Sequence, residues 1–158
     1  MHEITALVLA ECPTAVVRRR LEAPQIASWV GPAVDRVVRA VTAAGMHPAG
    51  PRFARYLHVE HTAACFDVEA GVVLAHPWPA DPTGRSDVLP SRLPGGPAAL
   101  TVHAGPYEAV TPAHEALEKW IAEHGGVPDG PSWECYLTEP VGDPDTWRTE
   151  VVQPYTFG

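Results

Sequence analysis

The segment at residues 133–136 places a carboxylate among aromatic side chains in one short apolar run, Trp-Glu-Cys-Tyr. Because side chains alternate between the two faces of a strand, Glu134 and Tyr136 are expected to share one face, opposite Trp133 and Cys135. If that face lines a groove, an ionised carboxylate walled by aromatic rings attracts a cation through its charge and through the ring quadrupoles, the second worth roughly 0.5 to 2 kcal/mol. The alternative is a solvated glutamate, or one that pairs with an arginine.

Other aromatic residues could complete such a groove. Tyr107 lies where a predicted strand yields to a helix, so it could close one end, although a packing role is equally consistent with that position. Trp29 and Trp78 occur in proline-rich or irregular surroundings, where an amphipathic indole could cover a ligand. Trp120 repeats at helical spacing and is expected in the core. The predicted ligand-binding residues are Glu134, Tyr136, Tyr56, Tyr107, Trp133, Trp29 and Trp78.

Two of these candidates have a structural interpretation beside the functional one. Tyr56 could be a core tyrosine with a bonded hydroxyl, as could Tyr136. Trp133 is the weaker candidate, because it and Phe53 lie on the opposite strand face and are expected to pack beneath the helices.

Two patterns contain metal-ligating residue types, but neither predicts a metal site. The HxxHxxxC pattern at residues 58–65 runs along a strand into a turn, which scatters its side chains, and no fourth ligand is evident. The HExxE pattern at residues 114–118 lacks the second histidine of the zinc helix motif and is interpreted as a solvated helix face. No Gly-rich phosphate loop, nucleophile elbow or CxxC pair occurs. The sequence therefore predicts no cofactor and no standard catalytic constellation, which leaves enzyme activity uncertain and disfavoured.

An internal repeat positions these residues. Residues 45–57 (GMHPAGPRFARYL) and 125–137 (GGVPDGPSWECYL) share six identities at one constant offset, and this alignment pairs Tyr56 with Tyr136. Residues 66–69 resemble residues 147–150 after a one-residue adjustment. At the first offset Pro32 matches Pro112, and both are interpreted as the starts of helices, the second with Thr111 as a hydroxyl cap.

Each half of the chain is therefore expected to contain a strand, a helix and a hairpin. Apolar residues at helical spacing predict one helix before Gly45 and another before Gly125. Strands are expected at residues 4–9, 15–19, 53–59, 64–68, 72–75, 100–103, 133–138 and 148–152. The predicted fold class is α+β, a duplicated strand-helix-strand-strand unit with pseudo-twofold symmetry, antiparallel sheets and both helices on one side.

The domain organisation follows from the same repeat. A stretch rich in turn formers at residues 77–85 is expected to link pseudo-repeats at about 1–76 and 86–158. Each half is short, so one domain with a shared core is favoured over two separate domains.

The composition limits the partners. Eleven Lys and Arg against nineteen Asp and Glu give a formal net charge of −8, which disfavours nucleic acid, and the basic run at residues 18–20 is expected to be solubilising. Three cysteines without CxxC spacing favour a reducing compartment, and no leader or long apolar run is visible, so a cytoplasmic location without membrane insertion is expected. A basic protein partner is compatible with the charge but not specified by it.

Four further segments form a pattern, namely residues 103–107 (HAGPY), 117–120 (LEKW), 130–140 (GPSWECYLTEP) and 149–150 (TE). Together they resemble the GyrI-like small-molecule-binding domain family, the effector-binding module of AraC-type and MerR-type regulators. The resemblance covers nearly the whole chain and implies a central groove that receives hydrophobic, often cationic or planar compounds. It also implies a ligand-binding role for Glu134, which matches the family's glutamate on the strand after the second helix. With no residues left for a helix-turn-helix, the chain resembles a stand-alone binding module.

Three functions are compatible with this sequence. The favoured one is binding, sequestration or sensing of hydrophobic, aromatic and often cationic small molecules. Some relatives hydrolyse cyclopropane-containing natural products, and Glu134 with Tyr136 or Tyr107 could supply acid and base groups, although the Trp-Trp motif associated with those hydrolases is absent from this chain. The third is inhibition of DNA gyrase by protein contact, as in the namesake of the family, for which no residue gives specific support.

Overall fold

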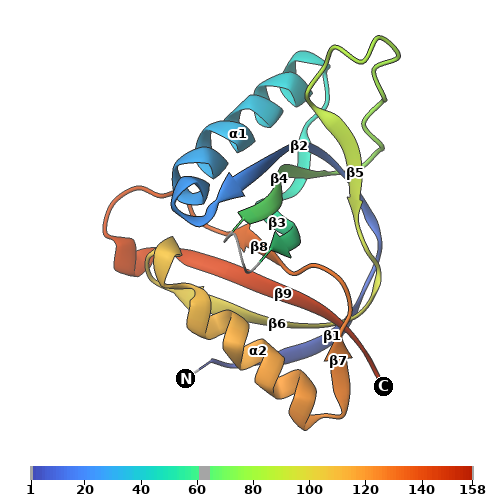
Figure 1. Ribbon diagram of the computed structural model, residues 1–158. Helices are drawn as coiled ribbons and strands as arrows, with labels where there is room; N and C mark the ends of the chain where they lie inside the picture. Colours follow the sequence, from blue (N-terminus) through green and yellow to red (C-terminus); the bar gives the residue numbers. More distant parts are fainter. Residues whose placement is uncertain (1, 61–64, 158) are drawn as a thin grey trace. The chain divides into compact units, whose positions relative to one another are not determined.

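The computed structural model describes residues 2–60 and 65–157 (Figure 1). Contacts between Cα atoms divide the chain into two compact units. One is the continuous unit, residues 10–95. The other is the split unit, which joins residues 2–9 to residues 96–157.

The continuous unit is an antiparallel sheet with one helix packed on it. Its strands lie in the order β3, β4, β2, β5, and α1 contacts β2, β3 and β4. The bounds are β2 (Cys12–Glu22), α1 (Ala23–Ala43), β3 (Pro48–Glu60), β4 (Cys65–Leu74) and β5 (Leu89–Leu93). Val34, Val37 and Val41 of α1 are buried, as their helical spacing predicts.

The split unit has the same two-layer construction. Its strands lie in the order β1, β6, β9, β8, with the short β7 paired to the far end of β9, and α2 packs across β6, β7 and β9 (Figure 1). The bounds are β1 (Thr5–Leu9), β6 (Gly96–Ala104), α2 (Thr111–Glu123), β7 (Gly126–Pro128), β8 (Trp133–Tyr136) and β9 (Arg148–Phe157). A core of Ala99, Ala113, Leu117, Ile121, Val151 and Tyr155 joins α2 to the strands.

The predicted α+β class with antiparallel strands is confirmed, and several boundaries are corrected. Helix α1 begins at Ala23, not at Pro32, because Gln25 accepts a hydrogen bond from the Glu22 backbone N–H at 2.9 Å and Pro24 suits the first turn. Pro32 is inside the helix on its exposed side, where water can satisfy the carbonyl that lacks a donor. Helix α2 begins one residue early, at Thr111, which therefore does not act as a hydroxyl cap.

Strands β5 and β7 were not predicted, and two strands that were predicted separately form the single strand β4. Pro90 interrupts the apolar run of β5, which is an edge position in its unit where a missing N–H is tolerated. Strand β7 lies in a segment whose sequence is typical of a turn. Strand β4 runs unbroken through Gly71, where two shorter strands were expected.

The compact units and the predicted repeats divide the chain differently. Strand β1, the first in the sequence, pairs with β6 and so belongs to the split unit. The predicted linker at 77–85 lies inside the continuous unit, between β4 and β5. The duplication and the single shared domain stay predictions. Of the helices that the structure describes, none is long and apolar enough to cross a membrane.

Candidate functional site

Glu134 lies on β8 and faces helix α2. It is directly opposite Val151 of β9, and cross-strand partners share one face of a sheet. Val151 belongs to the core that α2 covers, so the carboxylate lies on the helix side. Its side chain is only 6% exposed.

The carboxylate of Glu134 is held by a histidine and a tyrosine. His114 of α2 places Nε2 at 2.8 Å from Glu134 Oε2, while the Tyr136 hydroxyl donates to Oε1 at 3.5 Å. The expected shared face of Glu134 and Tyr136 is therefore observed. Neither a solvated nor an arginine-paired glutamate is found: the group is buried, and among the described residues no Lys or Arg pairs with it.

The interpretation of residues 114–118 as a solvated face is wrong for His114 and right for the two glutamates. His114 is half-buried against Glu134, with 24% of its side chain exposed, whereas Glu115 and Glu118 are exposed. The reason is the helical period: residue 114 follows the buried Ala113 on the edge of the packed face, and residues 115 and 118 point outward.

Three half-buried aromatic rings, from Tyr107, Tyr136 and Trp147, form an aromatic cluster beside this carboxylate. The Tyr107 ring centroid lies 5.1 Å from that of Tyr136 and 5.0 Å from that of Trp147. The Tyr107 hydroxyl donates to the Thr138 carbonyl at 2.8 Å, and Trp147 Nε1 donates to the Val141 carbonyl at 3.0 Å. These bonds orient both rings, so the cluster is a preformed aromatic wall.

Sequence reasoning predicted Tyr107 and Tyr136 but not Trp147. A signal was present, because Trp147 occupies the repeat position of Phe66, whose ring meets that of Tyr56 edge-on at 6.2 Å. The sequence repeat therefore matches the Tyr56–Phe66 contact of the continuous unit with Tyr136 and Trp147 of the aromatic cluster in the split unit.

Trp133 lies on the face of β8 that points away from α2. It is opposite Val152 and is 3% exposed. Trp133 therefore does not pack beneath α2, because that helix covers the face of its neighbour Glu134. Phe53, also assigned to the core, is fully buried in the continuous unit. Trp120 is half-buried, packed against the α2 core and stacked on His124.

The remaining candidates belong to the continuous unit. Trp29 lies within α1, not in irregular chain, and is half-buried. Trp78 does lie in a loop, where its Nε1 donates to the Val88 carbonyl at 3.3 Å. Tyr56 on β3 is half-buried beside Phe66. Their roles in ligand binding stay predictions.

A second buried carboxylate, Glu69, was not predicted. Its side chain is 0% exposed and meets Arg18 Nε at 3.1 Å, Arg55 Nη1 at 3.6 Å and the Ser91 hydroxyl at 3.2 Å. The basic run at 18–20 is thus more than solubilising, since Arg18 reaches Glu69 and Arg20 reaches Asp67 on the neighbouring strand. Glu69 is neutralised by guanidinium groups, whereas Glu134 meets an imidazole.

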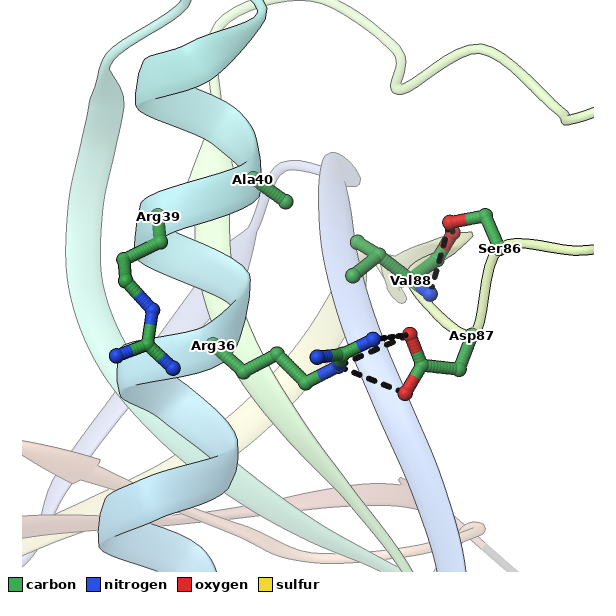
Figure 2. A pocket seen from close by; sticks show the side chains of 6 residues that line it. All are labelled: Arg36, Arg39, Ala40, Ser86, Asp87 and Val88. Carbon is green, nitrogen blue, oxygen red and sulfur yellow. Dashed lines mark hydrogen bonds and ion pairs between the residues drawn. The ribbon is translucent and has the colours of Figure 1, made fainter.

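A hollow on the continuous unit lies between α1 and the loop before β5 (Figure 2). Arg36 and Asp87 point toward each other there, with Arg36 Nη2 at 2.6 Å from Asp87 Oδ1, while Arg39 points away (Figure 2). The Arg36 guanidinium holds the pKa of Asp87 below its usual range. Both side chains of the pair are more than half exposed, at 55% and 57%, and the hollow contains none of the predicted binding residues.

Metal-ligating residues do not gather in the part of the chain that the structure describes. Within it there is no group of three or more His, Cys, Asp or Glu side chains able to hold an ion. Of the pattern at 58–65, His61 and the side chain of His58 lie outside what is described.

The antiparallel strands and the helix packed on them hold a buried carboxylate beside an aromatic cluster. Residues 33–156 match the sequence profile of the GyrI-like small molecule binding domain family. The match covers most of the chain, so this protein belongs to that family, as the sequence motifs predicted. A comparison with curated protein sequences found no match.

Solved structures share the fold at low sequence identity. The crystal structure of the EcmrR C-terminal domain matches with a TM-score of 0.78 at 16% identity, covering 100% of this chain and 99% of that one. The cryo-EM structure of an EcmrR–DNA complex matches with a TM-score of 0.80 at 18% identity, covering 99% of this chain and 58% of that chain. This protein therefore spans little more than half the length of EcmrR.

Two further structures are of proteins with other descriptions. A hydrolase from Listeria innocua has a TM-score of 0.64 at 12% identity, with 98% of this chain and 92% of that chain covered. SAV2435, solved bound to tetraphenylphosphonium, has a TM-score of 0.57 at 13% identity, with 98% and 94% covered. At these identities the likeness shows the fold alone.

Proposed function

We propose that this protein binds hydrophobic, aromatic and often cationic small molecules at Glu134, in a sequestering or sensing role. The observation that carries the proposal is the carboxylate itself: it is buried, and no described Lys or Arg neutralises it. The family's small-molecule-binding character and the structure of SAV2435 with a lipophilic cation support the same ligand class. The cysteine pattern supports a cytoplasmic site of action.

The energetics of a buried carboxylate favour a cationic ligand. Burial removes water from a charged group at a cost of several kcal/mol unless other charges and hydrogen bonds replace it. His114 and Tyr136 supply hydrogen bonds to Glu134, yet a neutral imidazole leaves its negative charge uncompensated. A cation in contact with the carboxylate supplies that compensation.

The contacts around Glu134 leave it able to accept a ligand. An ionised carboxylate has about four acceptor positions, and two interactions with described residues are present. The Tyr136 bond is at the distance limit for a hydrogen bond, so replacing it by a ligand's contact with Glu134 Oε1 costs little. The half-buried faces of the aromatic cluster can then stack on the ligand, and each cation–π contact adds roughly 0.5 to 2 kcal/mol.

Calorimetric titration with tetraphenylphosphonium tests the proposal. In Glu134→Gln we expect affinity for the cation to fall by roughly tenfold or more, because removing one charge from a low-dielectric site changes the binding free energy by more than about 1.4 kcal/mol. Affinity for triphenylphosphine oxide, an uncharged aromatic compound, should change little.

Glu118→Gln is the matched control, since it removes the same charge from an exposed position on α2. It should bind the cation as the unchanged protein does. If Glu134→Gln and Glu118→Gln lose affinity equally, the effect comes from net charge and the binding site is elsewhere.

Hydrolysis is the second candidate function, and two contacts of Glu134 favour it. Tyr136 and His114 both touch the Glu134 carboxylate, which is an arrangement of acid and base groups. A relative by fold is described as a hydrolase. Mass spectrometry of a cyclopropane-containing natural product incubated with the protein separates the candidates: equilibrium binding without a hydrolysed product leaves binding as the function.

A further inference from the structure

The partner of Glu134 can change its charge. Histidine is the side chain whose ordinary charge change lies between pH 5 and 8. When His114 is neutral, its Nε2–H donates to the carboxylate and the pair carries one negative charge. When His114 is protonated, the same contact at 2.8 Å is an ion pair with no net charge.

We propose that protonated His114 competes with a cationic ligand for the Glu134 carboxylate, and so determines which ligands the Glu134 site accepts. With His114 neutral, the site selects cations. With His114 protonated, the imidazolium takes the place of the ligand's charge, and the site accepts uncharged aromatic molecules instead. This inference rests on the proposed binding function of Glu134.

The geometry makes His114 suited to this role. Its ring comes from α2, whereas the carboxylate comes from β8, so a tertiary contact between residues 20 positions apart holds the pair together. The imidazole is half-buried, which keeps it open to proton exchange, while the carboxylate is nearly covered. An arginine in this place, such as Arg18 or Arg55 at Glu69, would neutralise the carboxylate at every physiological pH.

Other titratable groups near His114 must be separated from its effect. Those on the same side of the split unit or on the same helix are Glu134 and Tyr136 of β8, His103 of β6, Tyr155 of β9, Tyr107 and Glu108 before α2, and Glu115, Glu118, Lys119 and Glu123 of α2. Of these, His103 is the other histidine. His103 is 7% exposed, and its Nε2 lies 2.9 Å from the Pro106 carbonyl oxygen. It therefore has a different partner from His114.

The test is the pH dependence of affinity in the unchanged protein and in His114→Gln. Glutamine can still donate a hydrogen bond to Glu134 but does not titrate. Between pH 8.5 and 5.5 we expect affinity for tetraphenylphosphonium to fall roughly tenfold in the unchanged protein, since a positive charge appears beside the bound cation. In His114→Gln the affinity should stay near its value at high pH. Affinity for triphenylphosphine oxide should not fall in either protein.

A control variant and a second readout make the result specific. His124→Gln changes an exposed histidine at the other end of α2 and should keep the full pH dependence. Calorimetry in buffers of different ionisation enthalpy should show that cation binding at pH 6.5 releases protons from the unchanged protein, and from His124→Gln, but not from His114→Gln. Circular dichroism at each pH verifies that all variants are folded.

The outcomes distinguish this inference from the function on which it rests. Binding of the cation at Glu134 with no pH dependence, or with the same dependence in His114→Gln, overturns the role of His114 and leaves the proposed function standing. Absence of cation binding at every pH in both proteins overturns both.

Discussion

Three glutamates of low exposure differ in what replaces the water they lose. Glu69 meets two guanidinium groups, and Glu134 meets an imidazole and a phenol. Glu150 is half-buried on β9, on the face away from α2, and no described residue pairs with it. Desolvation therefore raises the pKa of Glu150 above its ordinary value. Glu69 thus belongs to a structural ion network and Glu134 to the candidate ligand site, whereas the desolvation of Glu150 is not compensated.

At the residue scale, Glu150→Gln should stabilise the protein at neutral pH. The folded-state pKa of Glu150 is raised, so the folded protein holds this proton more tightly than the unfolded chain, and ionisation above that pKa penalises folding. Glutamine carries no charge and avoids this penalty, so the variant should be the more stable protein at pH 7. Below about pH 4, where the glutamate is protonated in both states, the two proteins should have equal stability.

Urea unfolding at pH 4 and pH 7 measures this difference. The exposed Glu115→Gln provides the comparison, because it should change stability little at either pH. A Glu150→Gln protein that is less stable than the unchanged protein at pH 7 would contradict the desolvation argument.

At the scale of elements, the patterns that are local in sequence were the ones that could be predicted. The helical spacing of Val34, Val37 and Val41, and of Leu117 and Ile121, follows from a period of 3.6 residues that requires no partner. The helix and strand boundaries predicted from proline and glycine were less reliable. Pro32 did not begin α1, because the capping contact between Glu22 and Gln25 starts the helix earlier. Gly71 did not end β4, because the strand stays paired with β2 and β3 through this position.

Gly71 is needed where β4 pairs with β2, directly opposite Val16. A side-chain carbon at this position would lie 1.9 Å from the Ala15 carbonyl oxygen, which is backbone and cannot rotate away. Gly71→Ala must separate two central strands of the continuous unit, so we expect a loss of at least about 3 kcal/mol in the free energy of unfolding. Denaturant unfolding followed by far-ultraviolet circular dichroism measures it.

Gly31→Ala is the matched change in open space. Apart from its two chain neighbours and the backbone of its own helix, no described heavy atom lies within 4 Å of the added carbon, and the residue is inside α1 just before Pro32. Alanine gains about 0.5 to 1 kcal/mol in helix propensity, but its side-chain carbon meets the ring of Pro32, so we expect stability to change by less than about 1 kcal/mol. Equal effects of the two substitutions would show that backbone entropy, not the close approach, decides the cost at Gly71.

At the scale of the whole molecule, the first strand completes a unit made mostly of the last third of the chain. Strand β1 pairs with β6 from Thr5 opposite Leu100 to Leu9 opposite Gly96. Thr101 is 1% exposed, and its hydroxyl donates a hydrogen bond to the Glu3 carbonyl at 2.8 Å. Ile4 packs against the α2 core. The N-terminal residues therefore support the elements that carry Glu134 and His114.

Deleting residues 2–9 should loosen the split unit. The backbone groups of β6 that pair with β1 become exposed, so we expect their amide hydrogens to exchange at least tenfold faster, with a smaller change in β2. Mass spectrometry of hydrogen exchange locates the effect. Val8→Ala, at a position that is 79% exposed, should leave the exchange unchanged, and equal acceleration in β2 and β6 would contradict the assignment of β1.

The sequence by itself determined the fold class, the family and the shared strand face of Glu134 and Tyr136. Alternation along one strand placed Glu134 and Tyr136 together, and short motifs between residues 103 and 150 indicated the GyrI-like family. The tertiary structure decided which side chains meet that carboxylate, and it also decided that β1 pairs with β6. The physical reason is separation along the chain: periodicity is a property of neighbouring residues, whereas the contact between His114 and Glu134 depends on how a helix is set against a strand.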